Sequence, residues 1–167
     1  AASDVYKRQK LDPLQHKNTR IKHNLPLYEY DNLLEIKKIA TSSFIKHIFE
    51  PFIVFQENKH LNGFGPNLLG LLDSTSNLIN KEKRLNKKMR NDFFEIFQGK
   101  EKVNRSLRLL NKCNILGKYI PAFGKIVAQM QHDLFHVYTV DEHTLNVIDN
   151  IRSCLLYTSD AADDTPC

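Results

Sequence analysis

Apolar residues at helical spacing recur through the middle of the chain, but proline and glycine interrupt them every few turns. The first stripe is Phe44, Ile45, Ile48, Phe49, Phe52, Ile53 and Phe55. Its spacings of three and four residues predict an amphipathic helix, and Ser42 or Ser43 is expected to cap the start. Pro51 removes one hydrogen bond inside the stripe, so the helix is either kinked there or begins anew at the proline.

Three further helices are expected between clear breaks. Residues 62–66 form a break, and Pro66 suits the first turn of a second helix. Residues 77–86 form a mostly polar, basic connector. Gly99 ends a third helix, and a fourth begins at Val103. The apolar residues of these helices are Leu68, Leu69, Leu71 and Leu72, then Met89, Phe93, Phe94 and Phe97, then Val103, Leu107 and Leu110.

A tight turn is expected ahead of the helices. Two short apolar runs, in residues 25–30 and 33–36, flank Asp31 and Asn32, which both tolerate the left-handed conformation of tight turns. They allow a small β-hairpin, with Pro26 at its edge or start. The patterns predict an all-α fold, an irregular helical bundle preceded by this hairpin. Between the fourth helix and the last lies a short segment, residues 115–127, which is interrupted by Gly117, Pro121 and Gly124.

Both ends of the chain resemble translated sequencing-adapter DNA. One strand of a transposon-type adapter encodes Ala1–Gln9, and the opposite strand encodes Cys154–Asp163. This match predicts that residues 1–9 and 154–167 are artefacts, which have to be left out of fold reasoning. The genuine segment is then about residues 10–153, cut from a longer reading frame.

Composition narrows the classes of partner. The formal net charge is +5, which suits an acidic or phosphate-bearing partner or simply a solvated basic surface. Nucleic-acid binding is not expected, because the basic run lacks interleaved aromatic residues. Cys113 is interpreted as a small core residue, and a single native cysteine suits a cytoplasmic protein. No apolar run approaches the roughly 20 residues that span a membrane. The basic run is Lys81, Lys83, Arg84, Lys87, Lys88 and Arg90.

Three of the seven histidines lie within residues 132–143, among acids and hydroxyl residues. These side chains are suited to metal binding and proton transfer. Thr139 and Glu142 have the spacing of a capping box, which opens a final helix. His143 falls on the expected apolar face of that helix, where it is either a hydrogen-bonded core histidine or a metal ligand. That face is Val140, Val147, Ile148 and Ile151.

His132 and His136 are four residues apart, so in a helix both would point the same way. This spacing is half of a zinc-protease pattern. Asp133 stands where that pattern requires glutamate, and a metalloprotease is therefore disfavoured.

From about Leu33 to Arg152, the order of features resembles the family of bifunctional uridylyltransferase/uridylyl-removing enzymes that modify the PII nitrogen-signalling protein. The most specific segments are Leu107–Asn111, Ile115–Val127 and Gln129–Leu145. Ala128 departs from the pattern, because glycine is common there. The resemblance implies that residues 10–41 are a linker and hairpin from the end of the nucleotidyltransferase region. Residues 42–128 would be a helical interdomain region, and residues 129–153 the truncated start of an HD domain.

The resemblance also assigns the histidines. HD domains hold a divalent metal with a histidine, then a His-Asp pair, then a final aspartate. His132 and Asp133 imitate that pair, but the family pattern makes His143 the first metal ligand, and its true pair lies further on than this chain extends. The fragment would then carry one ligand of about four. His132, Asp133 and His136 are expected to be pocket residues, and phosphate binding is the alternative role for the two histidines.

The implied parent enzyme is cytoplasmic and uses Mg or Mn, UTP and PII, with glutamine as its signal and UMP as the released product. No residue of this chain is assigned to cofactor binding, and the fragment alone is expected to be inactive. Two alternatives stay open. One is a fragment of another HD-type metal-dependent phosphohydrolase. The other is a non-catalytic helical interaction module, whose basic face meets an acidic partner.

Overall fold

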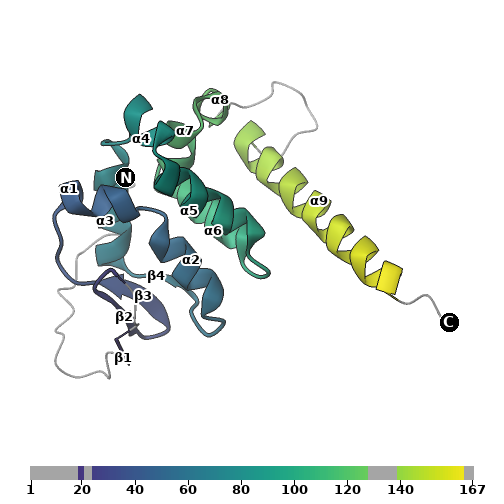
Figure 1. The fold of residues 1–167 in the computed structure, drawn as a ribbon, viewed down its shortest axis with the longest axis horizontal. Coiled ribbons are helices and arrows are strands. Elements are labelled where there is room, and N and C mark those ends of the chain that lie inside the picture. The colour runs from purple at the N-terminus through teal and green to yellow at the C-terminus, as the bar shows by residue number, and fades with distance from the viewer. Residues whose placement is uncertain (1–18, 21–23, 128–138, 164–167) are drawn as a thin grey trace, which may run out of the picture.

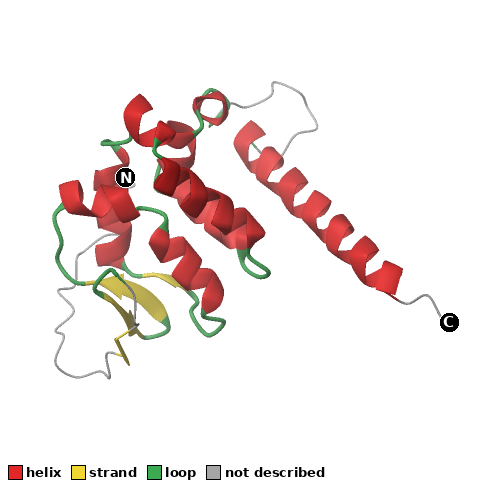
Figure 2. Ribbon diagram, viewed as in Figure 1, coloured by secondary structure: helices red, strands yellow, loops and turns green. Residues whose placement is uncertain are grey.

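The structure is a computed structural model that describes residues 19–20, 24–127 and 139–163. A small sheet lies at one end, short helices cover it and extend away from it, and one long helix runs along the outer side (Figure 1). Helices dominate the described residues (Figure 2). The predicted helical bundle with a small hairpin is therefore confirmed. No described helix has the length and apolar character that crossing a membrane requires.

The predicted hairpin consists of β2 (Leu27–Tyr30) and β3 (Leu33–Ile36), which pair antiparallel. Asp31 and Asn32 form its turn with φ angles of 50° and 57°, as a two-residue hairpin turn requires. Two strands were not predicted: β1 (Thr19–Arg20) pairs with β2, and β4 (Gly63–Phe64) pairs with β3 in parallel. A two-residue strand is too short to show an alternating pattern.

The first apolar stripe divides into three pieces. These are α1 (Thr41–Phe44), a 3₁₀ turn η1 (Ile45–His47) and α2 (Glu50–Glu57). Pro51 lies in the first turn of α2, so the helix begins anew there, as one of the two alternatives predicted. The predicted serine cap is wrong. Ala40 occupies the cap position without a side-chain hydrogen bond, because α1 begins at Thr41 and takes both serines inside.

The next helices are α3 (Pro66–Ser76), α4 (Lys81–Leu85), α5 (Lys87–Gln98) and α6 (Val103–Lys112). Pro66 starts α3 and Gly99 follows α5, as predicted. Helix α4 corrects the prediction of a connector over residues 77–86. It has no buried residue and therefore no apolar signal, but Asn80 accepts a hydrogen bond from the Lys83 amide at 2.9 Å, which caps its start.

The broken segment forms α7 (Ile115–Tyr119) and α8 (Pro121–Gly124). These helices meet at two glycines: a Cβ added to Gly124 would lie 2.5 Å from the Gly117 carbonyl oxygen. Cys113 is buried, and burial raises the pKa of its thiol to about 11, as expected for a core residue rather than a nucleophile. The last helix, α9 (Val140–Asp163), continues across the predicted adapter boundary.

A buried carboxylate joins the hairpin to α3. Glu35 accepts hydrogen bonds from the backbone amides of Asn67 at 3.1 Å and Leu68 at 3.3 Å, in the position that satisfies the free amides of a helix start. Burial raises the pKa of Glu35 and outweighs these hydrogen bonds, which lower it. Gly65 makes the arrangement possible, because a Cβ there would collide with the Glu35 side chain.

An aromatic cluster connects the region before α2 to α5 and α7. The Phe49 ring centroid lies 5.2 Å from that of Phe93 and 4.9 Å from that of Tyr119, and the Phe93 and Tyr119 centroids are 4.7 Å apart. The Tyr119 hydroxyl is buried and has no hydrogen-bond partner among the described residues. Burial raises its pKa.

Replacing Tyr119 with phenylalanine is expected to raise the free energy of unfolding by about 1 kcal/mol, because the buried hydroxyl contributes a desolvation cost without a hydrogen bond. Urea unfolding followed by circular dichroism measures the change. Tyr28→Phe is the control, since Tyr28 is only half-buried, and it should differ little from the wild type. A loss of stability in Tyr119→Phe would contradict the expectation.

Candidate functional site

Helix α9, which carries His143, lies beside α6 along the outer side of the molecule (Figure 1). Its inward residues are Asp141, Leu145, Ile148 and Arg152, at spacings that share one side of a helix. Leu145 is 1% exposed and Ile148 packs against the core. The predicted apolar face is wrong for two of its four residues. Val147 and Ile151 are 39% and 54% exposed.

Polar contacts fix the start of α9 on α6. The Asn111 side-chain amide donates to buried Asp141 at 2.8 Å. Arg108 donates through one terminal nitrogen to Asn146 at 2.7 Å and through the other to Glu142. The segments Leu107–Asn111 and Gln129–Leu145, which carry the sequence resemblance, therefore contact each other in space.

A second arginine fixes α9 further along. Arg152 donates to the carbonyl oxygens of Phe97 at 2.5 Å and Gly99 at 2.8 Å. These carbonyls end α5, where a cationic side chain is favourable. Two arginines thus attach α9 to the rest of the fold. Arg108 of α6 binds side chains of α9, and Arg152 of α9 binds carbonyl oxygens at the end of α5.

His143 is exposed and does not lie among the inward residues of α9. This corrects the expectation that it faces the interior, and it rules out a core histidine. An exposed imidazole is suited to metal binding. Within the described residues, however, no three His, Cys, Asp or Glu side chains come together to hold a metal. His132, Asp133 and His136 lie outside the described residues.

Two residues of the basic run form hydrogen bonds or ion pairs with other parts of the fold, so the run is not only a solvated helix face. Arg84 donates to the carbonyl oxygen of Lys118 at 3.2 Å, and Lys88 contacts Glu50 at 2.8 Å and Asp92 at 2.6 Å. Burial raises the pKa of Glu50, but hydrogen bonds from His47 and Lys88 outweigh it and hold that pKa low. Part of the basic charge therefore serves the fold.

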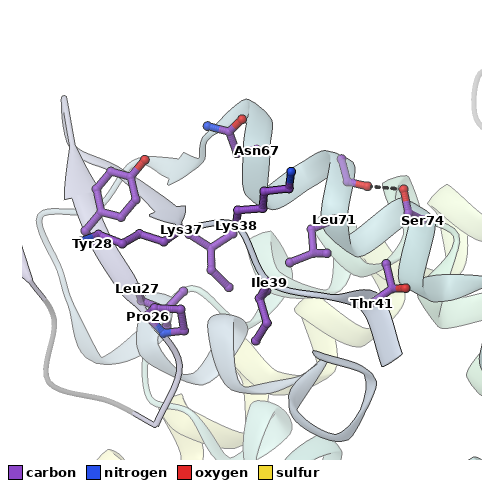
Figure 3. Close-up of a pocket in the computed structure, with 12 residues that line it drawn as sticks. Pro26, Leu27, Tyr28, Lys37, Lys38, Ile39, Thr41, Asn67, Leu71 and Ser74 are labelled. Atoms are coloured by element: carbon purple, nitrogen blue, oxygen red, sulfur yellow. Dashed lines mark hydrogen bonds between the residues drawn. The ribbon is translucent and has the colours of Figure 1, made fainter. Parts of the chain in front are cut away.

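A groove of about 950 Å³ lies on other elements, between the hairpin, α1 and α3 (Figure 3). Its described lining includes no acid, histidine or cysteine. Buried Leu27 and Ile36 give it an apolar floor, and exposed Lys37 and Lys38 give it a cationic rim. Sequence reasoning missed the groove because separate segments supply it. The lining residues are Pro26, Leu27, Tyr28, Ile36, Lys37, Lys38, Ile39, Thr41, Asn67, Gly70, Leu71 and Ser74.

Comparison with known proteins agrees with the resemblance seen in the sequence. A protein-family model described as uridylyltransferase GlnD third domain matches residues 30–119. The bifunctional uridylyltransferase/uridylyl-removing enzyme of Chromobacterium violaceum is 43% identical over 125 residues, which cover 73% of this chain and 14% of that protein. The enzymes of the same name from Ectopseudomonas mendocina and Azotobacter vinelandii are 44% and 39% identical over 63% and 71% of this chain.

No solved structure gives a significant match. The chain spans only 12–14% of the length of these relatives. Even so, the matched residues include the hairpin turn and continue to the end of α7, which is most of the packed core. The chain therefore belongs to the family of bifunctional uridylyltransferase/uridylyl-removing enzymes, and residues 30–119 correspond to its third domain.

Proposed function

We propose that this chain is the part of such an enzyme that joins the transferase region to an HD domain. The parent enzyme would uridylylate PII with UTP and remove UMP from it again, in response to glutamine, in the cytoplasm. The observation that carries the proposal is the third-domain match over residues 30–119, next to a helix that presents His143. Residues 10–41 would end the transferase region, residues 42–128 form the interdomain part and residues 129–153 begin the HD domain. Residues 1–9 and 154–167 would be adapter sequence.

His143 is the proposed first metal ligand of the uridylyl-removing site. Release of UMP from a modified tyrosine is phosphodiester hydrolysis, for which bound Mg or Mn supplies water activation and charge screening. The exposed imidazole on α9 can offer a nitrogen to such an ion from the side of the helix that faces away from α6. The other ligands would come from sequence beyond this chain, and His132, Asp133 and His136 would line the pocket.

The proposal is tested by replacing His143 with alanine in a complete enzyme of this family that contains the segment. Release of UMP from uridylylated PII is expected to fall by about 100-fold or more, because a direct ligand is lost. Uridylyl transfer should stay within about twofold, since it uses a different region. Both rates are measured on the same preparation. His60→Ala is the matched control, because His60 is an exposed histidine of the third domain.

Two results would contradict the proposal. One is an unchanged rate of UMP release in the His143→Ala enzyme. The other is release of UMP by the purified 167-residue chain, which would show that this chain alone contains a complete site.

A further inference from the structure

Helix α9 presents opposite sides to α6 and to solvent. A helix turns by about 100° per residue, so residue 143 lies about 200° around the axis from residue 141. Asp141 and Leu145 are buried against the third domain, and His143 is exposed. The direction of the His143 side chain therefore depends on the rotation of α9 about its own axis.

Apolar burial alone does not explain this rotation. Val147 and Ile151 stay exposed, although a rotated helix could bury both of them. Such a rotation would turn His143 toward α6, because His143, Val147 and Ile151 are successive residues at a spacing of four. The observed rotation instead places Asp141, Leu145, Ile148 and Arg152 on the inner side, so two apolar residues face inward in either rotation. The difference is that Asp141 and Arg152 form hydrogen bonds in the observed one.

Arg108 contacts the turn of α9 that contains His143. Its two terminal nitrogens bind Glu142 and Asn146, which are four residues apart and lie on either side of His143 in the sequence. Its remaining side-chain nitrogen donates to Asn104 at 2.9 Å, so the guanidinium is held from both helices. A planar fork with several donors suits such a contact, and a lysine ammonium cannot reproduce it.

We propose that Arg108 is a positioning residue for the uridylyl-removing reaction. It fixes the rotation of α9 and thereby the side on which His143 stands. This inference rests on the proposed function, since it assigns a role to a third-domain residue in the chemistry of the next domain. Arg108 itself touches neither substrate nor metal in the proposal, and its effect passes through Glu142 and Asn146.

The test compares Arg108→Ala, Arg108→Lys and Arg105→Ala in the complete enzyme. Arg105 is the matched control, because it is an exposed arginine on the same helix. In Arg108→Ala, kcat for UMP release is expected to fall by about tenfold or more, with KM for uridylylated PII and the transfer rate within about twofold. Arg108→Lys should recover only part of the loss. Hydrogen exchange of peptides from α9, measured without metal, should be faster in Arg108→Ala and unchanged in Arg105→Ala.

Two outcomes would overturn the inference. Wild-type UMP release in Arg108→Ala would show that Arg108 does not position the site. An equal loss of release and transfer would show that it only supports the fold. The His143→Ala enzyme separates this inference from the proposed function. If His143→Ala abolishes release and Arg108→Ala does not, only the inference fails, whereas normal release in His143→Ala removes the proposed function.

Discussion

Replacing Phe49 with alanine is expected to lower the free energy of unfolding by about 3–5 kcal/mol. The Phe49 ring is 0% exposed and contacts Phe93 and Tyr119. The truncation would leave a cavity beside Phe93 of α5 and Tyr119 of α7, and the close packing of a protein core limits how far the site can collapse. Urea unfolding of the chain measures the loss.

The matched control for this change is Phe94→Ala. Phe94 lies on α5 next to Phe93, but it is 62% exposed, so its removal should change the free energy of unfolding by less than about 0.5 kcal/mol. Equal losses in the two variants would show that the aromatic cluster does not form the core of the chain.

Gly124→Ala is expected to lower the free energy of unfolding by about 2–3 kcal/mol. The added Cβ would lie 2.5 Å from the Gly117 carbonyl oxygen. That atom belongs to the backbone of α7 and cannot move aside as a flexible side chain can. The helices α7 and α8 would have to separate, and thermal unfolding of the two proteins should reveal the difference.

Gly70→Ala tests whether the effect comes from this contact. A Cβ at Gly70 would meet nothing within 4 Å, and Gly70 lies inside α3. Alanine favours a helix over glycine, so this variant should be more stable by about 0.5–1 kcal/mol. If both glycine variants were stabilised, the close approach of α7 and α8 would be contradicted.

Local sequence signals predicted much of the fold. Asp31 and Asn32 formed the turn that their backbone tolerance indicated, and Pro66 and Gly99 stood at the helix ends where their chemistry places them. These features depend on neighbouring residues only. Helix α4 escaped prediction because it buries no apolar residue and its start is set by the side-chain cap of Asn80.

The candidate site was less predictable, because polar contacts between residues far apart in the sequence determine which side of α9 faces the core. Periodicity placed His143 on an apolar face, whereas Asn111 and Arg108 hold α9 in a different rotation. Arg108 lies 38 residues before Asn146, and Asn111 lies 30 residues before Asp141, so no local pattern could reveal these contacts. The assignment of His143 came from the resemblance of the segment Asp141–Leu145 to the family.

The Glu35 contact with α3 has a consequence for where the third domain begins. The family match starts at Tyr30, the last residue of β2. A polypeptide that began there would keep Glu35 but lose the strand that pairs with β3 along its length. The carboxylate that accepts hydrogen bonds from the start of α3 would then lie on a strand that keeps only the two-residue β4 as a described neighbour. The boundary drawn from sequence similarity therefore divides the hairpin, and a polypeptide that keeps both of its strands has to start at or before Leu27.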